Sequence, residues 1–176
     1  MIFHETTLQG AYLIESEPAA DSRGSFARVY CRREFEKQGL QVEFVQNSIS
    51  VNQKRGTLRG LHYQAEPDGE VKLVQCVRGA LFDVIVDLRP YSASYGRWFG
   101  VELSAENNRL LYVPEGVAHG FQTLADNTAV YYMISAFYAP QSARGVRWND
   151  PALAIDWPLA DPIISGKDSG WPDLKL

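Results

Sequence analysis

Alternation of apolar and polar side chains is the dominant pattern along this chain. Across residues 82–88, apolar residues at 82, 84, 86 and 88 are interleaved with aspartates at 83 and 87. The run 129–138 has the same period and places Val130, Tyr132 and Ile134 on one face. A period of two is typical of a β-strand, since successive side chains point to opposite faces of a sheet. The pattern therefore predicts a fold made mostly of strands.

Turn residues separate these runs at short intervals. Asp68-Gly69 and Arg89-Pro90 both combine residues that favour tight turns. The segment 73–88 consists of two β-rich runs divided at Arg78-Gly79, which predicts a β-hairpin. Only residues 32–38 and part of the last twenty residues have a helical pattern. We therefore predict an all-β sandwich or barrel, with a few short helices in the N-terminal and C-terminal parts.

The length of 176 residues is sufficient for one well-buried core and too small for two. Because no repeat or linker interrupts the chain, we predict a single domain over residues 1–176. The tail from Asp150 is rich in proline and aspartate, with Trp157 and Trp171 to anchor it. It is either a loose wrap over the barrel or a segment that lays a carboxylate across the barrel mouth, where small barrels hold ligands.

Composition narrows the possible partners and the compartment. A net charge of −4 provides no general basic surface, so we expect no nucleic-acid partner and a local site for any anion. No stretch approaches the roughly 18 apolar residues of a membrane span, and the first residues do not have the pattern of a signal peptide. Cys31 and Cys76 lie far apart and form no CxxC pair. We interpret them as reduced thiols of a cytoplasmic protein.

Proton chemistry near neutral pH has few candidate residues, since the histidines are His4, His62 and His119. His62 follows Arg59 closely and precedes Lys72 by ten residues, all within strand-like sequence. An arginine, a histidine and a lysine in such proximity indicate a base that acts on an anionic substrate. A surface histidine among scattered charges would give the same spacing, so position alone leaves both interpretations open.

Two local patterns, at 60–64 and 114–119, resemble the cupin superfamily of jelly-roll barrels. Metal-binding cupins supply an HxH pair, a glutamate and a later histidine. Here Gln64 replaces the second histidine of the pair, and Lys72 places an ammonium group beside the site. Because the ammonium repels a divalent cation and two histidines make a poor ligand set, we expect no metal.

With a lysine in place of the metal, the site suits enolate chemistry. Removal of a proton next to a ketone needs a base at the carbon and a cationic or hydrogen-bonding group at the oxygen. His62 can be that base and Lys72 the partner of the oxygen. Inversion also needs a donor on the opposite face, a role that suits a tyrosine. Periodicity alone does not select Tyr132 among the nine tyrosines.

Further motifs, spread over nearly the whole chain, make a family resemblance specific. Taken in order, they resemble those of the dTDP-4-dehydrorhamnose 3,5-epimerase family, metal-free cupins that act on nucleotide-linked 4-keto-6-deoxy sugars. The blocks are DSRGSF at 21–26, FVQN at 44–47, LRGLHYQ at 58–64, KLVQCVRG at 72–79, FDVIVDLR at 82–89, LSAEN at 103–107, PEGVAHGF at 114–121, WNDP at 148–151 and KD at 167–168.

The resemblance implies an isomerase that needs no cofactor, and it implies a role for each catalytic residue. His62 is the base, and Asp168 is the carboxylate that orients its ring and stabilises its cation. Lys72 faces the C-4 ketone oxygen. Tyr132 matches the proton donor.

The resemblance also implies a binding site for sugar, diphosphate and nucleoside, and a homodimer in which N-terminal strands exchange. In such a dimer Arg23 reaches the ligand of the neighbouring subunit. His119 either contacts the ligand or supports the barrel. The expected substrate-binding residues are Arg23, Gln46, Asn47, Arg59, Lys72, His119 and Lys167.

Two departures from the family pattern fall in nucleotide contacts. Arg28 and Ala143 stand where the family usually has acidic residues. They leave dTDP, GDP and CDP open as the carrier, and the single base leaves open epimerisation at C-3, at C-5 or at both. The alternatives are a ketoisomerase acting on a similar sugar and a non-catalytic cupin that binds a nucleotide sugar. A mere binder needs no acid and base on opposite faces, so the retained residues favour an enzyme.

Overall fold

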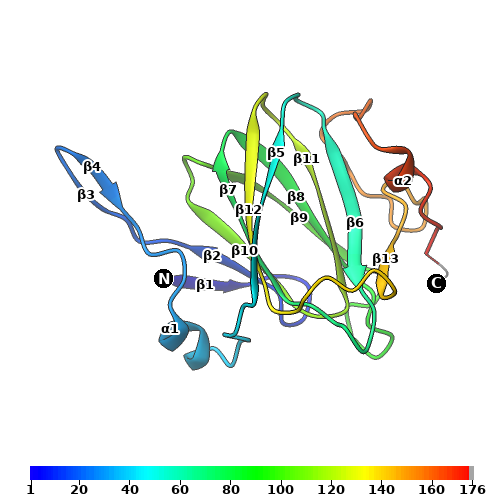
Figure 1. The fold of residues 1–176 in the computed structure, drawn as a ribbon, viewed down its shortest axis with the longest axis horizontal. Coiled ribbons are helices and arrows are strands. Elements are labelled where there is room, and N and C mark those ends of the chain that lie inside the picture. The colour runs from blue at the N-terminus through cyan, green and yellow to red at the C-terminus, as the bar shows by residue number, and fades with distance from the viewer. Residues whose placement is uncertain (175–176) are drawn as a thin grey trace.

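Two facing β-sheets form a barrel, which confirms the prediction of an all-β, cupin-type jelly roll with few helices (Figure 1). The structure is a computed structural model and describes residues 1–174. The six-stranded sheet has the order β1 (Ile2–Glu5), β2 (Tyr12–Glu15), β10 (Arg109–Val113), β7 (Lys72–Arg78), β12 (Thr128–Ile134) and β5 (Gln46–Asn52). The five-stranded sheet has the order β13 (Ala143–Gly145), β6 (Leu58–Gln64), β11 (Val117–Thr123), β8 (Ala80–Asp87) and β9 (Trp98–Ser104).

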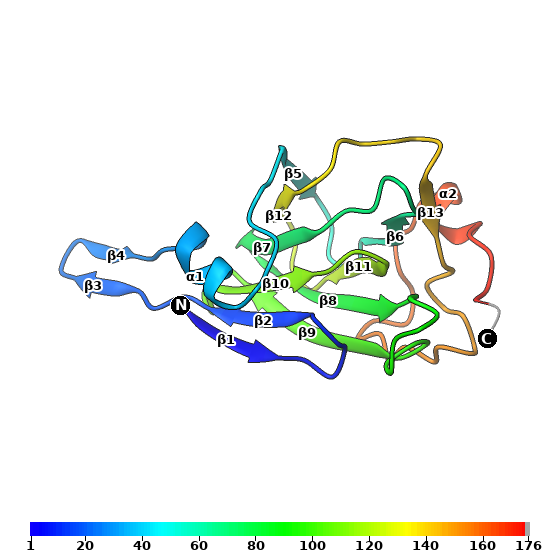
Figure 2. The same cartoon turned by 90° about the horizontal axis from the view of Figure 1, so that it is seen from below.

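The remaining elements lie outside the two sheets. Strands β3 (Ala19–Asp21) and β4 (Gly24–Phe26) form a hairpin that projects away from the barrel (Figures 1 and 2). Helix α1 (Arg32–Lys37) follows it, and helix α2 (Gly166–Ser169) lies beside β6 in the C-terminal segment. These are the short N-terminal and C-terminal helices that the sequence predicts. Within residues 1–174, no helix is both long enough and apolar enough to cross a membrane.

The predicted hairpin at 73–88 is wrong. Strand β7 pairs with β10 and β12 in one sheet, whereas β8 pairs with β11 and β9 in the other. Gly79 joins them at a φ of 75°, where a side chain is strained, and a Cβ there would lie 2.6 Å from Thr128 Oγ1. The glycine therefore carries the chain from one sheet to the other. Residues 78 and 79 do separate two strands, as the sequence predicts, but a turn signal does not reveal which sheet the next strand joins.

Strand β8 separates two packed layers. Its residues Leu81 and Ile85 point into the barrel and join the apolar cluster between the sheets. On the opposite face, Val84 and Val86 pack beneath the C-terminal segment, together with Trp157. Alternation therefore places the aspartates of β8 on the inner side, where Asp83 is fully buried. A third cluster packs α1 against the outer face of the six-stranded sheet.

Candidate active site

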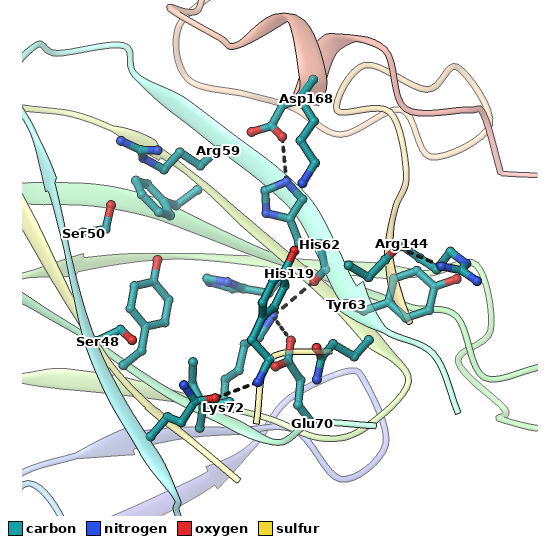
Figure 3. Close-up of a pocket in the computed structure, with 18 of the residues that line it drawn as sticks. Ser48, Ser50, Arg59, His62, Tyr63, Glu70, Lys72, His119, Arg144 and Asp168 are labelled. Carbon is teal, nitrogen blue, oxygen red and sulfur yellow. Dashed lines mark hydrogen bonds and ion pairs between the residues drawn. The ribbon is translucent and has the colours of Figure 1, made fainter. Parts of the chain in front are cut away.

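A pocket opens at the mouth of the barrel, between the two sheets and the C-terminal segment (Figure 3). Strands β5, β6, β7, β11 and β12 contribute inward-facing side chains, and α2 closes one side. The pocket brings together most of the residues predicted from the sequence, namely Gln46, Arg59, His62, Lys72, His119, Tyr132, Lys167 and Asp168.

His62 and Asp168 form the central pair of the pocket. His62 Nε2 lies 2.7 Å from Asp168 Oδ1, although the two residues are 106 positions apart in the sequence. The imidazole is 40% exposed to the pocket, whereas the carboxylate side chain is only 8% exposed. The second carboxylate oxygen accepts a hydrogen bond of 3.2 Å from the amide of Gly60. The C-terminal segment thus supplies a carboxylate at the barrel mouth, as one interpretation of the tail expected.

Hydrogen bonding decides the charge of Asp168. Burial by itself raises the pKa of a carboxyl group, because it disfavours the charged form. The hydrogen bonds from His62 and from Gly60 outweigh burial and hold the pKa of Asp168 below its ordinary value of 3.8. Asp168 is therefore an anion at neutral pH, and its oxygens only accept hydrogen bonds. In a neutral imidazole, Nε2 then carries the proton and Nδ1 keeps a lone pair.

Lys72 lies on the floor of the pocket at the start of β7. Its ammonium nitrogen lies 2.9 Å from Glu70 Oε1 and donates to the backbone oxygen of His62 at 3.3 Å. Both charged side chains are nearly buried, with exposures of 10% and 12%. A buried ammonium with two fixed partners has a defined position, and in this pocket that position lies next to the base.

Tyr132 and His119 adjoin the same pocket from neighbouring sheets. Their rings meet edge to face with centroids 5.9 Å apart. Burial raises the pKa of Tyr132 far above its ordinary value, so the hydroxyl group stays protonated. His119 Nε2 lies 2.7 Å from Asp83 Oδ1, and both residues are buried in the barrel. The structure thus gives His119 a fixed internal partner as well as a place in the pocket wall.

Polar contacts also hold the pocket residues Arg59, Gln46 and Gln64. Arg59 Nε donates to Asn52 Oδ1 at 2.8 Å. The side-chain oxygen of Gln46 accepts from the amide of Tyr138 at 2.8 Å. Gln64, which takes the place of the cupin histidine, is buried and bonds the backbone of the loop after β12. Within residues 1–174, no three His, Cys, Asp or Glu side chains come close enough to hold a metal ion.

Two of the predicted residues lie outside the pocket. Arg23 sits at the turn of the projecting hairpin, where its side chain is 88% exposed and pairs with Asp21. Asn47 lies on β5, but it is exposed on the face opposite to Gln46 and Ser48, which both line the pocket. Strict alternation along β5 thus brings Ser48, and not Asn47, to the site.

The sequence patterns missed several residues of the pocket wall. Ser48 and Ser50 follow Gln46 at every second position of β5, so the period of two could have identified them. Glu70 falls in the region where a metal-binding cupin has its glutamate, which is a signal that could have identified it. Arg144 lies outside any motif, and no sequence signal indicates it. The sequence predicts Trp171 as an anchor of the tail. Its ring also lines the pocket, and the centroids of its ring and that of His62 are 6.1 Å apart.

The two departures from the family pattern lie in different places. Ala143 lines the pocket at the first position of β13. Arg28 follows the projecting hairpin and pairs with Glu34 at 3.2 Å, outside this pocket.

Comparisons with known proteins identify the family of this chain. The family model described as dTDP-4-dehydrorhamnose 3,5-epimerase matches residues 5–175. The dTDP-4-dehydrorhamnose 3,5-epimerase of Methanothermobacter thermautotrophicus is 48% identical, over 98% of this chain and 94% of that protein. The dTDP-4-dehydrorhamnose 3-epimerase of Streptomyces niveus is 41% identical, over 92% of this chain and 78% of that protein.

A solved structure gives the same result at the level of the fold. The crystal structure of dTDP-4-dehydrorhamnose 3,5-epimerase from Bacillus anthracis, with TDP and pyrophosphate bound, superposes with a TM-score of 0.95. It is 43% identical and covers 98% of this chain and 99% of its own. These findings confirm the predicted family and the isomerase class. The chain belongs to the dTDP-4-dehydrorhamnose 3,5-epimerase family.

Proposed function

We propose that this chain inverts C-3 and C-5 of a dTDP-linked 4-keto-6-deoxy sugar, by removing a proton and returning one through an enolate. The pairing of His62 with Asp168, in a pocket that also holds Lys72 and Tyr132, is the observation that carries the proposal. A base, a partner for the enolate oxygen and a proton donor are the groups that this reaction requires.

His62 removes the proton from the carbon next to the C-4 ketone. Because Nε2 bonds the Asp168 carboxylate, Nδ1 is the nitrogen with a free lone pair. When Nδ1 takes the proton, the ring becomes a cation, and the adjacent carboxylate stabilises that cation. One base serves both C-3 and C-5, since both carbons are neighbours of the same ketone.

Lys72 stabilises the negative charge that develops on the ketone oxygen. Its ammonium group is already held by Glu70 and by the backbone oxygen of His62, so little reorganisation is needed during the reaction. Tyr132 then returns a proton from the opposite face. Burial keeps its phenol protonated, which is the state that a donor requires.

The pocket residues Arg59 and Lys167 provide the positive charge that a diphosphate needs. We assign substrate contacts to Gln46, Arg59, Lys72, His119 and Lys167 in the pocket of one subunit. Ser48 takes the contact expected of Asn47, because the side chain of Asn47 points away from the pocket.

We also propose a homodimer with exchanged N-terminal strands, in which Arg23 reaches the ligand of the other subunit. The projecting hairpin supports this arrangement, because Arg23 and Phe26 are highly exposed at a distance from the barrel (Figure 1). Strand β5 is an edge strand, and its outer face exposes Ile49 and Val51, at 62% and 53%. Exposed apolar side chains on an edge strand are typical of an interface with a second copy.

The reaction needs no cofactor, since a base and a donor move protons without a change of oxidation state.

Cytoplasmic location is our proposal for the compartment. Both cysteines are free thiols, Cys76 being buried, as is usual in a reducing environment.

The deciding experiment is incubation with a dTDP-linked 4-keto-6-deoxy sugar in deuterated water, followed by mass spectrometry and NMR of the sugar. We expect deuterium at C-3 and C-5 of the product, with both centres inverted. Parallel reactions with GDP- and CDP-linked sugars test the carrier. Absence of exchange with all three substrates would contradict the proposal.

A second candidate is epimerisation at C-3 alone. The Streptomyces niveus relative, which is named a 3-epimerase, favours it. The same experiment separates the two candidates, because deuterium at C-3 without deuterium at C-5 would select the 3-epimerase.

A further inference from the structure

The carboxylate partner of His62 is held on a very short support. Helix α2 has four residues, Gly166–Ser169, and one helical turn is not stable by itself in water. Its N-terminal cap is the side chain of Ser165, which accepts a hydrogen bond of 3.1 Å from the amide of Asp168. The 2.7 Å contact of Asp168 with His62 therefore depends on what holds this turn against the barrel.

Trp171 docks the segment that carries Asp168. Its indole ring packs on Gly145 of β13 so closely that a Cβ at residue 145 would lie 2.4 Å from two ring carbons. Directly beyond the ring, the amide of Arg147 donates to the oxygen of Pro172 at 3.0 Å, and Arg147 pairs with Asp173 at 2.7 Å. The absence of a side chain at Gly145 thus leaves space for the indole ring, and this contact fixes the segment to β13.

The indole ring of Trp171 also contacts His62 and Lys167 in the pocket. Its edge-to-face contact with His62 restricts the plane of the imidazole, and the ammonium of Lys167 lies 5.7 Å above its face. Trp171 is also among the groups that lower the pKa of Asp168. One side chain therefore contacts or orients the base, its carboxylate partner and a cation of the pocket.

We propose that Trp171 is a positioning residue for proton abstraction. By packing against Gly145, it holds Asp168 within hydrogen-bonding distance of His62. The proposal rests on the proposed function of the pocket. It concerns the body of the ring, which packs tightly against Gly145. Replacement by phenylalanine keeps an aromatic ring and removes the indole nitrogen, through which Trp171 helps to lower the pKa of Asp168.

The test compares Trp171→Ala, Trp171→Phe and Gly145→Ala with Gly166→Ala as a matched control. Gly145 does not have a positive φ, so alanine there adds only the clash with the ring. A Cβ at Gly166 meets nothing within 4 Å, although this residue lies in the same segment. If Trp171→Ala fails to fold, Gly145→Ala and Trp171→Phe still test the proposal.

The first measurement uses no substrate. In the proton NMR spectrum of protein with ¹⁵N-labelled histidine, the Nε2 proton between His62 and Asp168 gives a low-field signal. The buried pair of His119 and Asp83 gives a second signal that serves as an internal reference. We expect Trp171→Ala and Gly145→Ala to lose the first signal and keep the second. Retention of the His62 signal in both variants would overturn the proposal.

The second measurement is kinetic. We expect kcat of Trp171→Ala and Gly145→Ala to fall at least tenfold, with KM changed by less than twofold. Trp171→Phe should recover most of the loss, and Gly166→Ala should match the parent protein. A rise in KM at unchanged kcat would overturn the proposal, because it would make Trp171 a binding residue. If the parent protein catalyses no exchange, the proposed function fails, whereas the NMR result stands independently.

Discussion

Two histidine–carboxylate pairs with the same 2.7 Å contact occupy this barrel, and they differ in almost everything else. His119 and Asp83 lie on adjacent paired strands, with exposures of 5% and 0%. His62 lies on β6 with 40% exposure, and its partner Asp168 arrives from the C-terminal segment. The first pair is part of the barrel wall. The second is assembled from separate parts of the chain and faces the pocket.

We propose on this basis that the first pair has a structural role and the second a catalytic one. Proton transfer needs a ring nitrogen that is open to the substrate, and of these two rings His62 is the more accessible, at 40% exposure against 5% for His119 in the pocket wall. A buried pair instead satisfies polar groups that would otherwise lack partners. Substitutions in the two pairs and at Tyr132 test this division.

His62→Ala should abolish deuterium exchange, because it removes the base that starts the reaction. General bases contribute about 10²–10⁴ in rate, so the activity should fall by at least that factor. His4→Ala is the matched control, since His4 is 49% exposed on β1 and far from the chemistry. Mass spectrometry of the sugar measures both variants. Exchange by His62→Ala at the parent rate would exclude His62 as the base.

Tyr132→Phe should separate the two halves of the reaction. His62 still removes and returns a proton on one face, so deuterium exchange persists while inversion falls by about 10²-fold. NMR of the sugar measures inversion and exchange in the same sample. Tyr131→Phe, on the neighbouring position and the opposite face of β12, is the control. Inversion that continues unimpaired in Tyr132→Phe would remove Tyr132 from the mechanism.

Asp83→Ala should cost more stability than Asp168→Ala. Breaking a fully buried pair leaves an uncompensated polar group and lowers the free energy of unfolding by about 3–5 kcal/mol. Loss of the pair at the pocket surface should cost less, about 1.5–3 kcal/mol, as for a hydrogen bond to a charged group. Urea denaturation measures both values. Equal losses would contradict the division into a structural and a catalytic pair.

The stability contributed by Asp168 should depend on pH in acid. Its pKa in the folded chain lies below the ordinary 3.8, so the unfolded state binds the proton more tightly. The contribution is therefore complete above pH 3.8 and is lost as the pH falls through the folded pKa. We expect the difference in unfolding free energy between the parent protein and Asp168→Asn to shrink below pH 3.8. A difference that grows in acid would reverse the assigned sign.

Local patterns predicted the elements better than their arrangement. The period of two identified β8 and β12, because alternation is a property of the strand itself. It could not assign β7 and β8 to different sheets, since that choice depends on packing across the barrel. Alternation along β5 favours Ser48 over Asn47 as the pocket residue, because Ser48 shares a face with Gln46.

The candidate site was harder to predict from the sequence than the fold. Nothing in the spacing of residues pairs His62 with Asp168, because the contact joins segments 106 positions apart. Only the resemblance to a family supplied that pair. Trp171 shows another limit of prediction from the sequence. A tryptophan in a proline-rich tail predicts burial, but its contact with His62 depends on a strand that meets the tail only in the folded molecule.

The C-terminal segment is also packed firmly against the barrel. It covers the apolar outer face of the five-stranded sheet, where Trp157 and Leu153 pack over Val84 and Val86. Burial of each such side chain contributes about 1.5–3 kcal/mol, so lifting the segment would cost several of these contributions at once. We expect the segment to act as a fixed wall and not as a lid. Nucleotide sugars then enter and leave through the open mouth, and turnover requires no large motion of the residues that hold Asp168.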